Sequence, residues 1–106
     1  MMDARFLRNE MLWGKEGQAR LARAHVILFG LGGVGSYVAE CLARSGIGEL
    51  TLVDGDTVAL SNLNRQLEAL SSTIGLPKAE AVARRIAEIN PEAVLHPMQA
   101  LYNADN

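Results

Sequence analysis

The chain has 106 residues, of which 49% are hydrophobic and 21% charged, and its formal net charge is −2. This composition suits one small globular domain, and its slight acidity excludes a general electrostatic attraction to nucleic acids or anionic membranes. Cys41 is the single cysteine, which excludes an internal disulfide, and no apolar stretch fits a secretion signal or a membrane span. We therefore expect a cytoplasmic protein without membrane contacts.

The first 24 residues are predicted to form short helices that precede the main fold. Leu7 and Met11 share one face of a helix over residues 3–12, and Gly14 and Gly17 interrupt the pattern before a second short helix. This interpretation divides the chain into an N-terminal helical segment, 1–24, and a nucleotide-binding half-domain, 25–106.

From residue 25 onward, strand and helix patterns alternate. Residues 26–29 are a continuous β-prone apolar run, typical of a strand that is buried on both faces of a parallel sheet. Residues 50–53 and 94–98 are predicted as the second and third strands. Right-handed crossovers between them give three parallel strands in the order 3-2-1. The predicted fold class is α/β, the N-terminal half of a Rossmann-like doubly wound parallel sheet.

Helices connect these strands. The helix over residues 33–44 is expected to end at Gly46, a short helix covers 62–70, and a longer helix opens at Pro77 and stops at Asn90 and Pro91. Helical spacing assigns two apolar stripes to the core: Val34, Val38, Cys41 and Leu42 in the first helix, and Ala79, Val82, Ile86 and Ile89 in the last.

The sheet predicted here has an open side. A doubly wound sheet continues beyond its first strand, yet the chain ends before any further strand is made, which leaves residues 26–29 as an apolar edge. We therefore expect that this chain is the N-terminal piece of a longer protein, or that a partner chain completes the sheet.

A glycine-rich turn follows the first strand. Glycines at 30, 32, 33 and 35 let the backbone turn tightly and approach an anion, and the following helix presents free N–H groups and its positive dipole end. Asp54 ends the second strand, 24 positions after Gly30. A carboxylate at this place in a dinucleotide fold can accept hydrogen bonds from ribose hydroxyls. This pattern fits NAD and ATP equally well, and a tight turn without a ligand is the structural alternative.

Two further features favour phosphate chemistry. On a helix that begins near Ser61, the side chains of Asn62, Arg65 and Gln66 share one face, and an arginine held in this way clamps phosphate oxygens. Lys78 occupies the first turn of its helix, where the dipole disfavours a cation unless it reaches towards phosphates. The alternatives are a solvated helix face for Arg65 and neutralisation of Lys78 by Glu80.

Several motifs occur together in a fixed order along nearly the whole chain. They are Gly30 to Gly35, Leu52 to Val58, Ser61 to Gln66, Gly75 to Lys78, and Ile89 to Pro91. Together they resemble the ThiF/MoeB-type adenylating superfamily, whose members are relatives of the ubiquitin-activating enzymes. Within the superfamily, the sequence looks most like the dehydratase branch, which uses ATP to cyclise threonylcarbamoyladenosine in tRNA. The segments that carry this likeness are the N-terminal start 8–12, the turn 14–17 and the run 73–80.

The resemblance implies roles for particular residues. ATP and Mg²⁺ would be the cofactors, tRNA the substrate and a homodimer the assembly. Arg65 and Lys78 would be catalytic, since they offset negative charge while a carboxylate oxygen attacks the α-phosphorus and pyrophosphate leaves. The implied cofactor-binding set is Gly30, Gly32, Gly33, Gly35, Asp54, Asp56, Asn62, Arg65, Lys78 and Arg8, the last sometimes supplied by a neighbouring subunit in this superfamily.

Three other interpretations stay open. The chain could be part of an NAD(P)-dependent oxidoreductase, could adenylate the C-terminus of a ubiquitin-like sulfur carrier, or could be a non-catalytic piece that binds a partner through its open sheet edge. His25 and His96 are far apart in the sequence without ligand spacing, so no metal ligand is predicted. Arg84 and Arg85 are predicted to form the solvated face of the last helix.

Overall fold

The computed structural model describes residues 4–101, so the outer ends of the two predicted segments, 1–3 and 102–106, lie outside the described residues. Its elements in chain order are a 3-10 helix η1 (Ala4–Phe6), α1 (Leu7–Arg23), β1 (His25–Phe29), α2 (Gly33–Ser45), β2 (Glu49–Val53), a 3-10 helix η2 (Leu60–Asn62), α3 (Lys78–Ile89) and β3 (Val94–Met98). Within the described part of the chain, no helix is both long enough and apolar enough to span a bilayer.

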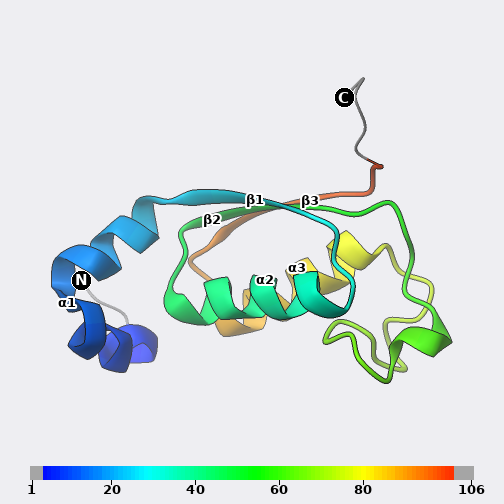
Figure 1. Cartoon of the computed structure of the whole chain (residues 1–106), viewed down its shortest axis with the longest axis horizontal. Coiled ribbons are helices and arrows are strands. Elements are labelled where there is room, and N and C mark those ends of the chain that lie inside the picture. The colour runs from blue at the N-terminus through cyan, green and yellow to red at the C-terminus, as the bar shows by residue number, and fades with distance from the viewer. Residues whose placement is uncertain (1–3, 102–106) are drawn as a thin grey trace.

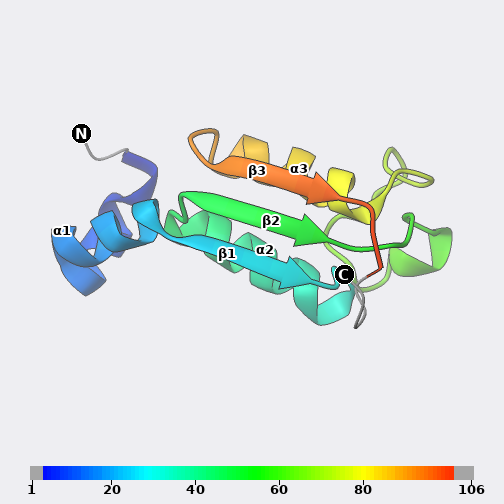
Figure 2. The ribbon, with the colours of Figure 1, turned by 90° about the horizontal axis from the view of Figure 1, so that it is seen from above.

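The three strands form one parallel sheet in the order β1-β2-β3, which confirms the predicted order. Both connecting helices, α2 and α3, cover the same face of the sheet (Figures 1 and 2). This follows from the topology, because two right-handed crossovers that step in the same direction place their helices on the same side. The opposite face carries no helix from residues 4–101.

The prediction that β1 is buried on both faces was wrong. Val26 and Leu28 pack against the core, but Ile27 and Phe29 point to the opposite face and are 52% and 54% exposed. An apolar run indicates a strand that can be buried on both faces. Within residues 4–101, however, only the face that packs on α2 and α3 is covered.

The core lies between the sheet and the two helices. Its buried members are Leu31, Ala39, Ala43, Ile47, Leu50, Leu52, Ala79, Val82 and Ile86. The stripe predicted for α3 is therefore confirmed, with Ile89 partly buried at its end.

The stripe predicted for α2 was wrong. Val34, Val38 and Cys41 are exposed, Leu42 is half-buried, and the small residues Ser36, Ala39 and Ala43 face inward instead. Small side chains allow α2 to pack close to the sheet. A prediction based on the large apolar residues therefore chose the wrong face of this helix.

The ends of the helices follow the local sequence signals. Gly46 takes the left-handed conformation at the C-cap of α2 (φ 95°), as predicted. Asn90 follows α3, and its buried Nδ2 donates to the Ile47 carbonyl at 3.0 Å. Gly14 breaks the N-terminal helix with φ 77°, so α1 consists of two helical pieces joined at a kink.

The predicted short helix over 62–70 is absent. The chain forms η2 and then a series of turns through residue 75, which pack beside the ends of β1 and β2. Its backbone bonds are isolated turns, such as Arg65 N–H to the Asn62 carbonyl, and the Leu67 N–H bonds to Ser36 Oγ of α2 instead of to a preceding helical turn.

Candidate nucleotide-binding site

The glycine turn joins β1 to α2 and is closed by its own backbone. Gly30 has φ 92°, a conformation that side chains disfavour, and a Cβ on Gly35 would lie 2.0 Å from the Gly30 carbonyl oxygen. Gly32 is the N-cap of α2 and supplies no side-chain hydrogen bond to the helix end. The first-turn N–H groups therefore point into the turn without an intrahelical partner, an arrangement suited to an anion.

Asp54 ties the glycine turn to the end of β2. Its Oδ2 accepts a hydrogen bond from the Leu31 N–H at 2.7 Å, and its Oδ1 accepts one from the Asp56 N–H at 2.8 Å. A carboxylate has about four lone-pair positions, so these two bonds leave capacity for a ribose hydroxyl. Asp56 is exposed, and its carbonyl oxygen accepts from the Lys78 N–H at 3.0 Å.

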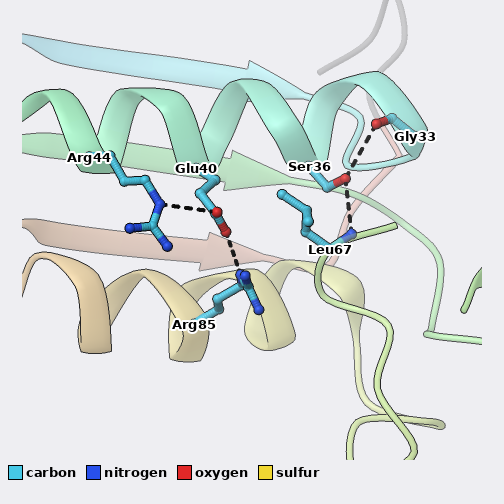
Figure 3. A network of polar contacts seen from close by, with 6 residues as sticks. All are labelled: Gly33, Ser36, Glu40, Arg44, Leu67 and Arg85. Carbon is cyan, nitrogen blue, oxygen red and sulfur yellow. Dashed lines mark hydrogen bonds and ion pairs between the residues drawn. The ribbon is translucent and has the colours of Figure 1, made fainter. Parts of the chain in front are cut away.

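The segment 61–67 packs against the glycine turn. The Arg65 Cδ lies 3.9 Å from the place that a Cβ on Gly33 would take, and the Gln66 Nε2 lies 3.8 Å from the place of one on Gly32. Ser36 Oγ of α2 accepts from the Leu67 N–H at 3.4 Å and donates to the Gly33 carbonyl at 3.5 Å (Figure 3). Arg65 is thus beside the turn, as the sequence predicts.

Asn62, Arg65 and Gln66 do not share one face, which corrects the helical expectation. Asn62 is buried, and its Oδ1 accepts from the Ala59 N–H at 2.8 Å, so it shapes the local turn. Gln66 is buried as well, whereas Arg65 is exposed. The Arg65 Nη1 donates to the Ser61 carbonyl at 3.1 Å and to Asn64 Oδ1 at 2.9 Å, so the guanidinium is hydrogen-bonded to its own loop.

Lys78 is the first residue of α3 and is only 7% exposed. Glu80 does not neutralise it, because Glu80 pairs with Arg84 at 2.8 Å. The acidic side chain that interacts electrostatically with Lys78 is Glu68, which sequence reasoning missed. The available signal was one acid within the otherwise apolar run 67–70.

Glu68 is a buried carboxyl group at 1% exposure, and neither of its side-chain oxygens has a hydrogen-bond partner among residues 4–101. Burial raises its pKa, and the nearby Asp54 charge adds to that rise, while the charges of Lys78 and Arg85 oppose it. These charge interactions place the carboxyl group near both the end of β2 and the start of α3.

An ion-pair network joins α2 to α3 (Figure 3). Glu40 accepts from Arg44 Nε at 3.1 Å and from Arg85 Nε, and the hydrogen bond from Arg85 is the main reason that the pKa of Glu40 is lowered. The same contact raises the pKa of Arg85. Arg85 is therefore an interhelical contact, which corrects its predicted place on the solvated face, whereas Arg84 is exposed as expected.

Arg8 lies at the other end of the molecule. Its neighbour Asn9 donates through Nδ2 to the Arg44 carbonyl at 2.8 Å, so this part of α1 contacts the C-terminal end of α2. Eleven helical residues, about 16 Å, separate Arg44 from Gly33. Figure 1 shows the same separation, with α1 at one end of the sheet and the 60–75 loop at the other. Within one chain, the structure does not bring Arg8 to the glycine turn.

A parallel sheet whose first strand leads through a glycine turn into a helix, with an acid ending the next strand, defines the Rossmann-like class of α/β domains. Residues 6–106 match the ThiF family, and the chain belongs to that family. The resemblance stated from the sequence motifs is thus confirmed.

Relatives of known function are similar over almost the whole chain. The chain is 49% identical over 100 residues to the tRNA threonylcarbamoyladenosine dehydratase of Bacillus subtilis, covering 94% of the chain and 39% of that relative. It is 43% identical over 90 residues to the molybdopterin-synthase adenylyltransferase of Salmonella typhimurium, covering 85% of the chain and 36% of the relative. The crystal structure of the Escherichia coli tRNA N6-threonylcarbamoyladenosine dehydratase in complex with ATP superimposes with a TM-score of 0.94 at 45% identity, covering 96% of this chain and 42% of that one. This chain therefore spans about two fifths of the length of these relatives.

Proposed function

We propose that this chain is the ATP-binding part of an enzyme that adenylates a carboxylate, and that the carboxylate belongs to threonylcarbamoyladenosine in tRNA. The observation that carries the proposal is the position of the Arg65 side chain next to Gly33, since it brings an arginine to a glycine turn whose first-turn amides have no intrahelical partner. The similarity to dehydratases, one of them described in complex with ATP, supports the choice of nucleotide and substrate.

Each residue near the turn has a part in this scheme. The first-turn amides of α2 bind phosphate oxygens, and Asp54 binds the ribose while it holds the turn in place. Arg65 and Lys78 bind the triphosphate and offset the charge that grows as the carboxylate oxygen attacks the α-phosphorus and pyrophosphate leaves. Asn62 positions Arg65 through the local turn, because its carbonyl oxygen accepts from the Arg65 N–H at 3.2 Å.

The adenylated carboxylate then reacts within the same nucleoside. A nitrogen of the substrate attacks the activated carbonyl carbon, AMP leaves, and a ring closes. The net result is loss of water from the modified nucleoside at the expense of ATP, which becomes AMP and pyrophosphate.

The residues of this chain fit Mg²⁺ in part. Asp54 holds the turn and is assigned to the ribose, and the exposed carboxylate of Asp56 is a hard oxygen donor that suits this ion. Mg²⁺ characteristically keeps several waters and binds one or two carboxylates together with substrate phosphates. When bound, it would neutralise part of the triphosphate charge.

A homodimer is part of the proposal. Arg8 lies far from the glycine turn of its own chain, so it can contribute to a nucleotide site only from another copy. Sedimentation of the purified protein tests this assembly. A dimer whose ATP affinity falls with Arg8→Ala supports it, and a monomer that binds ATP with unchanged affinity in that variant contradicts it.

Adenylation of a sulfur-carrier C-terminus is the second candidate, because the molybdopterin-synthase adenylyltransferase is also similar. The dehydratase is favoured by the higher identity over a longer stretch. The family match disfavours the nicotinamide oxidoreductase, which also leaves Arg65 beside the turn without a role.

The test is ATP–pyrophosphate exchange by the protein that the complete gene encodes. We expect exchange that depends on tRNA carrying threonylcarbamoyladenosine, with unmodified tRNA as the matched control. Exchange driven by a carrier protein instead would select the second candidate. NADH binding without any response to ATP would overturn adenylation altogether.

A further inference from the structure

The open face of the sheet carries a cluster of two histidines and one glutamate. His25 and Glu49 are the first residues of β1 and β2 and are partners in the parallel register. His96 of β3 is the partner of Thr51, two positions after Glu49. Because side chains alternate along a strand, all four side chains project from the same face, the one that α2 and α3 leave bare in Figure 2. The strand register thus brings His25 and His96 together although they lie far apart in the sequence.

The three acid–base side chains are close enough to share a ligand. One donor atom from each of His25, Glu49 and His96 lies within 4.8 Å of the other two. His96 Nε2 is 2.6 Å and His25 Nδ1 is 3.9 Å from the same oxygen, Glu49 Oε2. Among residues 4–101, the three side chains are 42%, 37% and 46% exposed in that order.

The orientation of His25 is fixed by its second ring nitrogen. His25 Nε2 lies 2.7 Å from Thr51 Oγ1, and this hydrogen bond turns Nδ1 towards Glu49. A histidine that ligates a metal commonly donates its other ring N–H to an oxygen, which sets the tautomer and aims the free lone pair. Thr51 is only 9% exposed, so its hydroxyl is a well-positioned partner for this purpose.

Two imidazoles and one carboxylate form a donor set that suits zinc. Tetrahedral Zn²⁺ with bonds of about 2.0–2.1 Å requires donor atoms about 3.3 Å apart. The 2.6 Å distance between His96 Nε2 and Glu49 Oε2 would have to lengthen, and the 3.9 Å distance between His25 Nδ1 and Glu49 Oε2 would have to shorten, each by less than 1 Å. The two histidine nitrogens lie within 4.8 Å of each other and would have to approach by at most about 1.5 Å, a change that side-chain rotation permits. Magnesium and calcium favour all-oxygen sites and fit this set poorly.

We propose that His25 Nδ1, Glu49 Oε2 and His96 Nε2 bind one Zn²⁺ ion, with water as the fourth ligand. The ion would link all three strands near the start of β1 and β2. This site is independent of the proposed nucleotide function, because the glycine turn and Asp54 lie at the opposite, carboxyl ends of the same strands.

The test is zinc binding by tag-free protein that has been stripped of metal, measured by titration calorimetry. We expect one Zn²⁺ per chain in the parent, and at least tenfold weaker binding in each of His25→Ala, His96→Ala and Glu49→Gln. Zinc should raise the thermal midpoint of the parent and should have no effect on the double variant His25→Ala with His96→Ala. Magnesium at the same concentration should neither compete nor stabilise.

Cys41 is the exposed thiol that competes as a zinc ligand, so Cys41→Ser is the matched control and should bind zinc like the parent. Cobalt in place of zinc should give the visible absorption of tetrahedral coordination without a thiolate charge-transfer band. Circular dichroism establishes that each variant is folded. Zinc binding that survives the double variant, or a folded parent that binds no zinc, would overturn the site.

Discussion

Arg65 and Gly33 are packed against each other, although 32 positions separate them in the chain. The aliphatic part of the arginine passes the helix start at contact distance, with Cγ and Cδ 4.0 and 3.9 Å from the place of a Gly33 Cβ. Its Nη1 is meanwhile held by Ser61 and Asn64. The aliphatic stem of Arg65 therefore lies beside the start of α2, while its guanidinium is tied to its own loop.

Replacing Arg65 with alanine should weaken ATP–Mg²⁺ binding sharply. Loss of a charge-assisted hydrogen bond costs about 1.5–3 kcal/mol, which is about a tenfold to 150-fold increase in Kd. Titration calorimetry measures this, with Arg84→Ala as the control because Arg84 is exposed and pairs with Glu80 on α3. Equal affinities in the two variants would remove Arg65 from the site.

Alanine at Gly35 and alanine at Gly33 should have opposite consequences. A Cβ on Gly35 would collide with the Gly30 carbonyl at 2.0 Å, and backbone atoms cannot yield cheaply. We expect the free energy of unfolding to fall by about 2–4 kcal/mol in Gly35→Ala. Gly33→Ala meets nothing nearer than 3.9 Å, so urea denaturation should find its stability unchanged or up to about 1 kcal/mol higher. Similar losses in both variants would contradict this account of the turn.

Replacing Glu68 with glutamine should stabilise the protein at pH 7. Burial raises the pKa of this carboxyl group in the folded state above its ordinary value near 4.5. Its contribution to stability is therefore fully present below the ordinary pKa and is lost as pH rises through the raised pKa. Glutamine does not titrate, so the free energy of unfolding of the variant, relative to that of the parent, should increase as pH rises from 4 to 7. A variant less stable than the parent at pH 7 would mean that Lys78 holds Glu68 as a favourable anion.

Glu40 should behave in the opposite way. The pKa of Glu40 is lowered, chiefly by the hydrogen bond from Arg85. Its contribution to the stability of the fold is therefore present above its ordinary pKa and is lost as pH falls through the lowered pKa. We expect the free energy of unfolding of Glu40→Gln to be about 1–2 kcal/mol lower than that of the parent at pH 7. The loss is smaller than for breaking a fully buried ion pair, because water still reaches the carboxylate. Arg85→Ala should lose a similar amount, and the double variant should lose less than the sum. Strict additivity would show that the two side chains do not interact in solution.

Much of the candidate site could be predicted because its parts carry local signals. The glycines at 30 and 35 stand between a strand pattern and a helix pattern, and Asp54 stands at a strand end. Glu68 carried only a weak signal, a single acid in an apolar run, because its place depends on burial in an irregular loop beside the turn. Arg65 does lie beside the glycine turn, but loop packing and not a helix face brings it there.

Periodicity along the chain was sufficient for the three strands, the two connecting helices and their order. Side chains repeat with a period fixed by the local backbone, and the handedness of the crossovers is nearly invariant. Periodicity was not sufficient to tell which side of α2 faces the sheet, that Arg85 reaches Glu40, or that His25 meets His96. Those contacts join residues that are 45 and 71 positions apart, and they depend on strand register and helix packing. Such relationships exist only once the layers have come together, since a side chain's partner across a layer is set by geometry and not by its place in the sequence.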